Sequence, residues 1–172
     1  MDKTMDLTIG FKGQLALNAQ VVPLQEGYLK IGGTVDINQT NGLKFGVVCS
    51  ADPDTVDQIK AGVASGNVIR GVAVFDDAIA QNAPAHADRY LAGMPCAFLN
   101  HGFMWLAGWD KTESVTALTD PAIGCKVVYK TDTGVIGFVA ATAESAPSGY
   151  AFLANADVRA IEDNHGALIY IN

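Results

Sequence analysis

The amino-acid sequence predicts a mainly β protein. We expect a small β-barrel or sandwich of short antiparallel strands, with one inserted helix at about 53–65 and an Ala-rich helical excursion at about 76–93. Apolar and polar residues alternate along most of the chain, which is the pattern of half-buried strands. The chain has 172 residues, of which 49% are hydrophobic and 17% are charged, enough to bury a core. Residues 1–172 are therefore predicted to form a single β-rich domain, in which residues 1–50 are either an integral part or an N-terminal arm or subdomain.

Three strands are predicted in the first 50 residues. In Leu15–Val21 and Leu29–Ile37 most alternate positions are apolar, so each strand has one apolar face. The dipeptide Asn41-Gly42 follows, and it is typical of a type I′ hairpin turn because both central residues of that turn need a positive φ. We therefore expect a hairpin that leads into a third strand over Leu43–Ser50.

The helix at about 53–65 is predicted from its ends and its apolar spacing. Asp52 offers an N-cap and Pro53 suits the first turn, while Ser65-Gly66 provides a stop signal. Three apolar residues recur at i, i+3 and i+7: Val56, Ile59 and Val63. The second segment, 76–93, is rich in alanine and contains Pro84, which suggests one or two short helical turns between strands.

A second hairpin is predicted in the second half of the chain. Residues Ile123–Lys130 and Val135–Thr142 alternate in the strand pattern, and the turn sequence TDTG (131–134) joins them. Four side chains of the first strand are expected to face inward: Ile123, Cys125, Val127 and Tyr129. The turn residues at 164–166 then lead into a last strand over Ala167–Asn172.

Three cysteines are spread along apolar segments without a C-x-x-C pair. Cys49, Cys96 and Cys125 lie in the sequences FGVVCS, MPCAFL and IGCKVV. Small buried hydrophobes in a reducing compartment have this distribution, so we expect three buried, unlinked thiols.

Charge and hydropathy narrow the possible partners. The chain carries 11 Lys and Arg against 18 Asp and Glu, a net charge of −7, and no segment gathers the basic patch that nucleic-acid binding needs. No apolar stretch approaches a membrane span, and the N-terminal sequence lacks the apolar core of a signal peptide. We therefore expect no nucleic-acid or membrane partner, and synthesis and folding in the cytoplasm.

The sequence contains no recognisable motif for catalysis, a cofactor or a metal. His86, His101 and His165 do not have metal-ligand spacing, and no dinucleotide or phosphate-loop fingerprint is present. Asp52, Asp54 and Asp57 resemble part of a calcium loop, but they lack its central glycine and terminal glutamate. A solvated helix start explains them better. The sequence therefore predicts no cofactor, no metal and no enzymatic activity.

The densest apolar stretch is MPCAFLNHGFMWLAGW, residues 94–109. As a strand it would place Phe103, Trp105 and Trp109 on one face and Met104 on the other, so both faces would be apolar. Such a strand is either central in a packed fold or covered by a partner. Phe103, Met104, Trp105 and Trp109 are thus candidate core or interface residues.

Three segments resemble the structural cement, or head decoration, proteins of tailed bacteriophages. These segments are GVAVFDDAIAQNAP (71–84), YLAGMPCAFLNHGFMWL (90–106) and AIGCKVVYKTDTGVIGF (122–138), followed by an apolar C-terminal strand. In that family a G-V-A strand precedes an excursion, a step of the type L-x-G-x-P leads into the next strand, and a hairpin that begins I-G-x-x-V comes later. The resemblance covers residues 65–172, and the predicted helix has no match in it.

The resemblance implies a virion structural protein without a catalytic or cofactor site. It implies a small β-barrel-like domain that binds the outer surface of the head, stabilises the shell across neighbouring major capsid proteins and often forms a homotrimer. It places the protein at the capsid surface of the virion, assembled in the cytoplasm of the host bacterium. Two alternatives stay open: another virion component, such as a tail or fibre-base protein, and a small β-barrel hydrolase or ligand-binding protein. The last would use His101 and one carboxylate near Trp105 and Trp109.

Overall fold

The structure is a computed structural model that describes residues 19–21, 29–76, 86–111, 115, 117–163 and 166–172. Strands dominate these ranges, and no α-helix occurs within them. None of the described segments forms a helix long and apolar enough to span a membrane. The strands are β1 (Gln20–Val21), β2 (Leu29–Val35), β3 (Leu43–Lys44), β4 (Val48–Ala51), β5 (Gln58–Ala61), β6 (Val68–Ala73), β7 (Arg89–Tyr90), β8 (Pro95–Leu106), β9 (Lys126–Lys130), β10 (Ile136–Val139), β11 (Tyr150–Glu162) and β12 (Gly166–Ile171).

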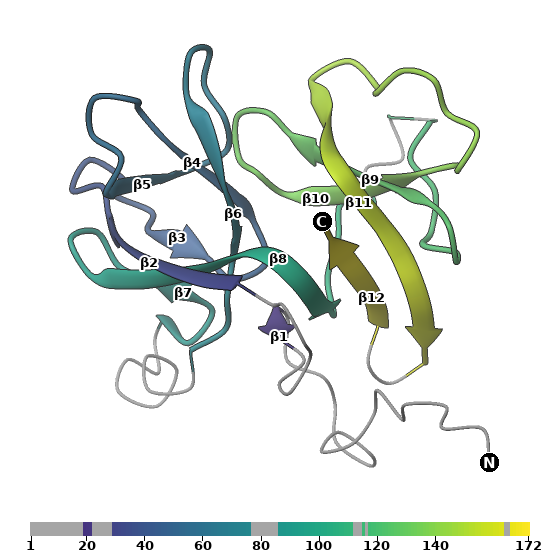
Figure 1. Cartoon of the computed structure of the whole chain (residues 1–172), viewed down its shortest axis with the longest axis horizontal. Helices are drawn as coiled ribbons and strands as arrows, with labels where there is room; N and C mark the ends of the chain where they lie inside the picture. The colour runs from purple at the N-terminus through teal and green to yellow at the C-terminus, as the bar shows by residue number, and fades with distance from the viewer. Residues whose placement is uncertain (1–18, 22–28, 77–85, 112–114, 116, 164–165) are drawn as a thin grey trace.

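The strands form two lobes that lie side by side (Figure 1). In the first lobe β2 pairs with β8 and β5, β5 pairs with β4, β4 pairs with β6, and β6 returns to β8. This ring is a small closed barrel, and the β2–β5 pair in it is parallel. Strands β3 and β7 form a separate two-stranded sheet. The prediction of a small β-barrel is confirmed.

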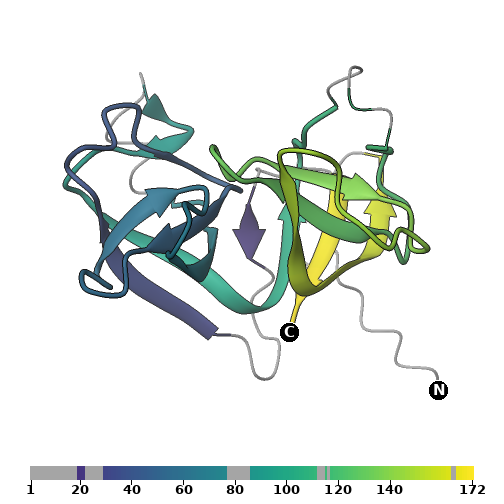
Figure 2. The ribbon, with the colours of Figure 1, turned by 90° about the horizontal axis from the view of Figure 1, so that it is seen from above.

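The second lobe is a curled sheet in the order β10-β9-β11-β12-β8, with β1 on the other side of β8. Strand β8 therefore belongs to both lobes, and Figure 2 shows it curving from one into the other. Its first half pairs with β2 and β6, and its second half pairs with β12 and β1. The two lobes are thus parts of one continuous hydrogen-bonded framework.

One apolar core runs through both lobes. It contains Val48 and Phe98 from the first lobe and Phe138 and Ile169 from the second. A smaller cluster lies on the opposite face of the second sheet, where Trp105 and Leu168 are fully buried and Phe103 and Ala160 pack beside them. Because strand residues alternate between faces, β8 supplies Met104 to the main core and Trp105 to the smaller cluster.

The predicted helix at 53–65 is wrong. Asp52 accepts a hydrogen bond from the Asp54 amide (2.9 Å) and begins a turn, after which β5 pairs with both β2 and β4. The side chain of Ile59, in β5, is fully buried, whereas that of Val56, before the strand, is 51% exposed. The spacing of the apolar residues that predicted a helix is therefore also compatible with a turn followed by a short strand.

The Ala-rich helical excursion predicted at about 76–93 is also not seen. Residues 77–85 lie outside the described residues, and the described part contains a short turn, then β7 and then a second turn. Tyr90 determines this geometry: it is buried, and its hydroxyl donates to the Val74 carbonyl at 2.8 Å. In the described part of the segment, pairing with β3 and this buried anchor favour a strand at Arg89–Tyr90.

The predicted hairpin at Asn41-Gly42 does not form. Gly42 has a φ of +67°, but Asn41 does not share the positive φ that a type I′ turn requires. Strand β2 instead pairs with β8 and β5, while β3 pairs with β7. The expected strand over Leu43–Ser50 is divided into β3 and β4. Of the strand expected over Leu15–Val21, residues 19–21 lie within the described residues, and they contain β1.

The second predicted hairpin is confirmed as β9 and β10, which pair antiparallel. Cys125, Val127 and Tyr129 are buried as expected, but Ile123 is 74% exposed because the strand begins only at Lys126. The predicted last strand is confirmed as β12. Strand β11, at 13 residues the longest strand that the structure describes, was not predicted from the sequence.

Candidate interaction surface

The lobes are also joined where the β9–β10 turn (131–134) meets the first barrel. The Val48 amide donates to the Gly134 carbonyl and the Val63 amide donates to the Thr131 carbonyl, each at 2.8 Å. Gly134 has a φ of +73°, and a Cβ at this position would overlap the Val48 carbonyl oxygen and lie 2.8 Å from the Gly62 nitrogen. This junction therefore requires glycine at 134, and it fixes one lobe against the other through backbone contacts.

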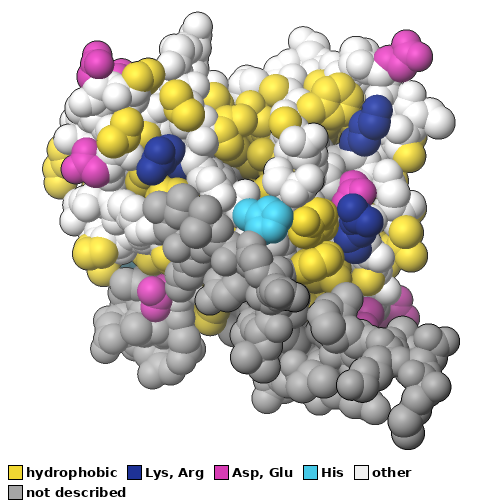
Figure 3. Space-filling view, viewed as in Figure 1, with side chains coloured by type: hydrophobic (Ala, Val, Ile, Leu, Met, Phe, Trp, Pro, Cys, Tyr) yellow, Lys and Arg dark blue, Asp and Glu magenta, His cyan; other side chains and the backbone are white. Residues whose placement is uncertain are grey.

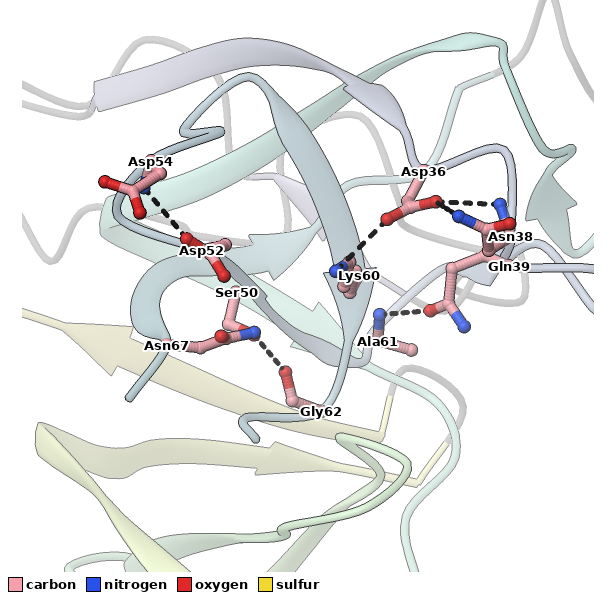
Figure 4. Close-up of polar contacts among 10 residues, drawn as sticks. All are labelled: Asp36, Asn38, Gln39, Ser50, Asp52, Asp54, Lys60, Ala61, Gly62 and Asn67. Atoms are coloured by element: carbon pink, nitrogen blue, oxygen red, sulfur yellow. Dashed lines mark hydrogen bonds and ion pairs between the residues drawn. The ribbon is translucent and has the colours of Figure 1, made fainter. Parts of the chain in front are cut away.

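Polar side chains of the first barrel form hydrogen bonds and an ion pair with neighbouring side chains and backbone groups (Figure 4). The buried Asp36 carboxylate accepts hydrogen bonds from the amide (2.7 Å) and the side chain (3.0 Å) of Asn38, and it pairs with Lys60 at 3.2 Å. The Asn38 amide, and then Lys60, hold the pKa of this carboxyl below its usual value. Ser50 donates to the Gly62 carbonyl at 2.6 Å. These contacts hold the loops of the barrel together.

The four candidate residues of the aromatic segment lie in different environments. Met104 and Trp105 are fully buried, on opposite faces of β8. Phe103 is half-buried beside the smaller cluster. Trp109 lies beyond the end of β8, where it contacts Phe138 edge-on at 5.7 Å and packs against the main core. Trp109 therefore does not share a face with Trp105.

The outer face of the second lobe carries a row of aromatic rings centred on Tyr170. Its ring lies 4.7 Å from that of Phe103 and 5.8 Å from that of His101, and the Arg159 guanidinium stacks over it at 5.2 Å. Asp157 binds Arg159 at 2.6 Å. These side chains come from β8, β11 and β12, which the sheet places next to one another.

Two hollows adjoin this face. The first, about 460 Å³, is lined by Lys126, Phe152, Asp157, Arg159 and Tyr170 among others. The second, about 170 Å³, lies at the boundary between the lobes and is lined by Ile69, Arg70 and Ile171. Leu153, Ala154 and Asn172 line both, so the hollows are neighbours. Figure 3 shows hydrophobic side chains gathered over this boundary, with Lys and Arg beside the hydrophobic groups of the second lobe.

A bulge in β11 shapes the wall between the hollows. Phe152 pairs with Val128 and Asp157 pairs with Lys126, so five steps along β11 match two steps along β9. The residues between them leave the ladder, and Asn155 adopts a left-handed φ of 57°. Bulges of this kind redirect side chains at functional surfaces. Sequence reasoning missed this surface, because the bulge interrupts the alternation that marks a strand.

Where the structure describes them, the chemistry-bearing residues considered from the sequence lie in separate parts of the fold. Among the described residues, no group of three or more His, Cys, Asp and Glu could hold a metal ion. His101 lies against Tyr170, and Asp52 caps the turn to Asp54. His165 lies outside the described residues.

The three cysteines are free and buried, as predicted. Cys49 is fully buried and its thiol contacts the Gly71 carbonyl at 3.4 Å. Burial raises the pKa of the Cys49 thiol well above its usual value, and it raises the pKa of the Cys96 thiol to about 11.

We expect native protein at pH 8 to resist maleimide reagents. A thiol of pKa about 11 is only about 0.1% ionised at that pH, so labelling should be more than about 100-fold slower than for an exposed cysteine. Mass spectrometry with and without denaturant measures this, and labelling of all three thiols should follow unfolding. Rapid native labelling of all three would contradict the buried positions of these segments.

The fold and this surface define a class: a two-lobed β protein with aromatic rings and a stacked cation on the outer face of its second lobe. The chain belongs to the family of phage structural cement proteins, because the family model described as Structural cement protein (E217 gp24/Pam3 gp6) matches residues 1–172, the whole chain. The match confirms the resemblance seen in the sequence and extends it through the first 64 residues. The protein is therefore a structural cement component of the virion, associated with the phage capsid. No curated protein matches the chain.

Proposed function

We propose that the protein binds the outer surface of the phage head and links neighbouring copies of the major capsid protein. The family match over the whole chain carries this proposal. The two-lobed framework supports it, because two lobes fixed by β8 and by the Gly134 junction can hold two neighbouring subunits at a set spacing. In this proposal the lobes act as one domain, the protein performs no catalysis, and it joins the head in the cytoplasm of the host bacterium.

Heads that lack the protein should assemble but release their DNA at a lower temperature than decorated heads. A protein that binds only the assembled lattice stabilises it by mass action, by about 2.7 kcal/mol per site at a free concentration a hundredfold above Kd. Heating purified heads from a gene-deleted phage, with and without added protein, measures the effect. Equal resistance of bare and decorated heads would contradict the proposed function, as would a particle that carries only a few copies.

We also propose that the protein self-associates as a homotrimer. Exposed apolar side chains remain on the single chain, including Ile37 at 70% and Ile123 at 74% exposure, and a symmetric oligomer can cover such groups and the sheet edges. Light scattering at micromolar concentration should give three times the 18.0 kDa mass of one chain. A monomer under these conditions would contradict a trimer that forms before binding.

A further inference from the structure

The two hollows beside Ala154 form one groove, which we define by Arg70, Lys126, Phe152, Ala154, Arg159 and Tyr170. We infer that this groove binds a segment of the capsid polypeptide in which carboxylate side chains stand beside apolar ones. The inference rests on the proposed function and adds to it the place of contact and the chemistry of the partner segment.

The charge of the groove differs from that of the molecule. Its lining contains three cationic side chains and one acidic side chain, Asp157, in a chain with a net charge of −7. Arg159 is neutralised by Asp157, but Lys126 donates to a neutral acceptor, the Ala143 carbonyl, at 2.6 Å. The Arg70 Nε is buried and has no hydrogen-bond partner among the described residues.

Of the five cationic side chains that the structure describes outside the groove, four are paired with a carboxylate and Lys44 is not. A carboxylate lies within 3.9 Å of each of Lys60, Arg89, Lys111 and Lys130. Arg70 and Lys126 have no such carboxylate partner in the described part of the chain. A carboxylate-bearing segment would supply the missing acceptors, and in a partly dry groove such charge-assisted bonds are among the stronger contacts available.

Each cation of the groove is held over an aromatic ring. Arg70 stacks on Phe98 at 5.6 Å, Lys126 on Phe152 at 5.5 Å and Arg159 on Tyr170 at 5.2 Å. Stacking restrains a long side chain without neutralising its charge, so less conformational entropy is lost when a partner binds.

The floor of the groove accounts for the apolar part of the proposed segment. Leu153 and Ile171 are buried at the base of the hollow between the lobes, and Ile69 at its rim is 37% exposed. Phe152 and Tyr170 are half-buried in the other hollow. Apolar side chains that lie between the carboxylates of the partner would cover these groups.

The first test removes the two unpaired charges. The double variant Arg70→Gln/Lys126→Gln should bind undecorated heads about 100-fold more weakly than wild type, about tenfold per lost charge pair. Its binding should also depend less on salt than wild-type binding does. The control Lys111→Gln/Lys130→Gln removes the same charge from paired sites outside the groove, and it should stay within about threefold of wild type. Thermal melts show whether each variant is folded.

The second test needs no loss of charge. Because the native thiols are buried, Ala154→Cys offers one exposed thiol in the groove, and Ser65→Cys offers one in the loop before β6 as a control. Both variants are labelled with a maleimide photo-cross-linker, bound to heads and irradiated. The probe attached at position 154 should capture a capsid peptide that contains Asp or Glu, and the probe attached at position 65 should not capture that peptide.

The outcomes separate the two proposals. If wild-type protein does not bind undecorated heads, the proposed function is wrong. If wild type binds and the groove variant binds equally well, the groove inference alone is overturned. It is also overturned if the probe at position 154 captures another copy of this chain, a capsid peptide without carboxylates, or no protein.

Discussion

Replacing Trp105 by alanine should lower the free energy of unfolding by about 3–5 kcal/mol. Trp105 is fully buried in the smaller cluster, where it lies with Leu168 on the face of the sheet opposite the main core. Removing the indole leaves a cavity beside Leu168, and the pairing of β8 with β12 restrains the strands from moving to fill it. Chemical denaturation followed by circular dichroism measures the change.

The matched variant Trp109→Ala separates stability from binding. Trp109 is only half-buried and lies beyond the end of β8, so its replacement should cost less stability than that of Trp105. If the aromatic segment also contacts the shell, Trp109→Ala or Phe103→Ala should reduce occupancy on heads while the protein stays folded. A Trp105→Ala variant as stable as wild type would contradict the buried position of this side chain.

Replacing Gly134 by alanine should lower the free energy of unfolding by about 2–5 kcal/mol. A left-handed φ costs an alanine about 1–2 kcal/mol, and overpacking adds about 1–3 kcal/mol. The added methyl group would overlap the Val48 carbonyl and approach the Gly62 nitrogen, so the turn has to move away from the first lobe and lose the Val48–Gly134 hydrogen bond. Denaturation curves should show a lower midpoint, and a broader transition if the lobes then unfold separately.

Gly149→Ala provides the control for backbone strain. Gly149 has a φ of +80°, but no atom lies within 4 Å of the position that its Cβ would occupy. This variant should lose only about 1–2 kcal/mol. The difference between the two variants therefore measures the close approach at the junction, and equal losses would show that the turn does not hold the lobes together.

The sequence was informative where a local pattern and the final packing agree. The hairpin of β9 and β10 was predictable because alternation continues up to a four-residue turn that ends in Gly134. The burial of Cys49, Cys96 and Cys125 followed from their apolar surroundings. The two apolar faces of β8 were also visible, because Met104 and Trp105 are adjacent and both large.

Elsewhere, tertiary contacts decided between two interpretations of one pattern. The spacing of Val56, Ile59 and Val63 suits a helix, but Ile59 pairs in a strand between β2 and β4. Asn41-Gly42 suits a hairpin, but the flanking strands find partners in β8 and β7. Such pairings join residues far apart in the chain, so a local window does not contain them.

The groove could not be predicted for a related reason. Its residues come from β6, β9, β11 and β12, and only the topology brings these strands together. Its central wall is the bulge around Asn155, where the alternation fails. The family resemblance indicated the role of the protein but identified none of these residues.

Because β8 pairs with strands of both lobes, the newly made chain cannot complete all the pairings of this strand at once. The barrel needs residues 95–101 of β8 before it can close, and the second sheet needs β12, which is made about 60 residues later. Pairings this distant in sequence close large loops and slow the folding rate. During synthesis the first barrel can form while the second half of β8 still lacks β12 as a neighbour. That strand edge is then open to pairing with other nascent chains until the end of translation, so aggregation competes with folding in this interval.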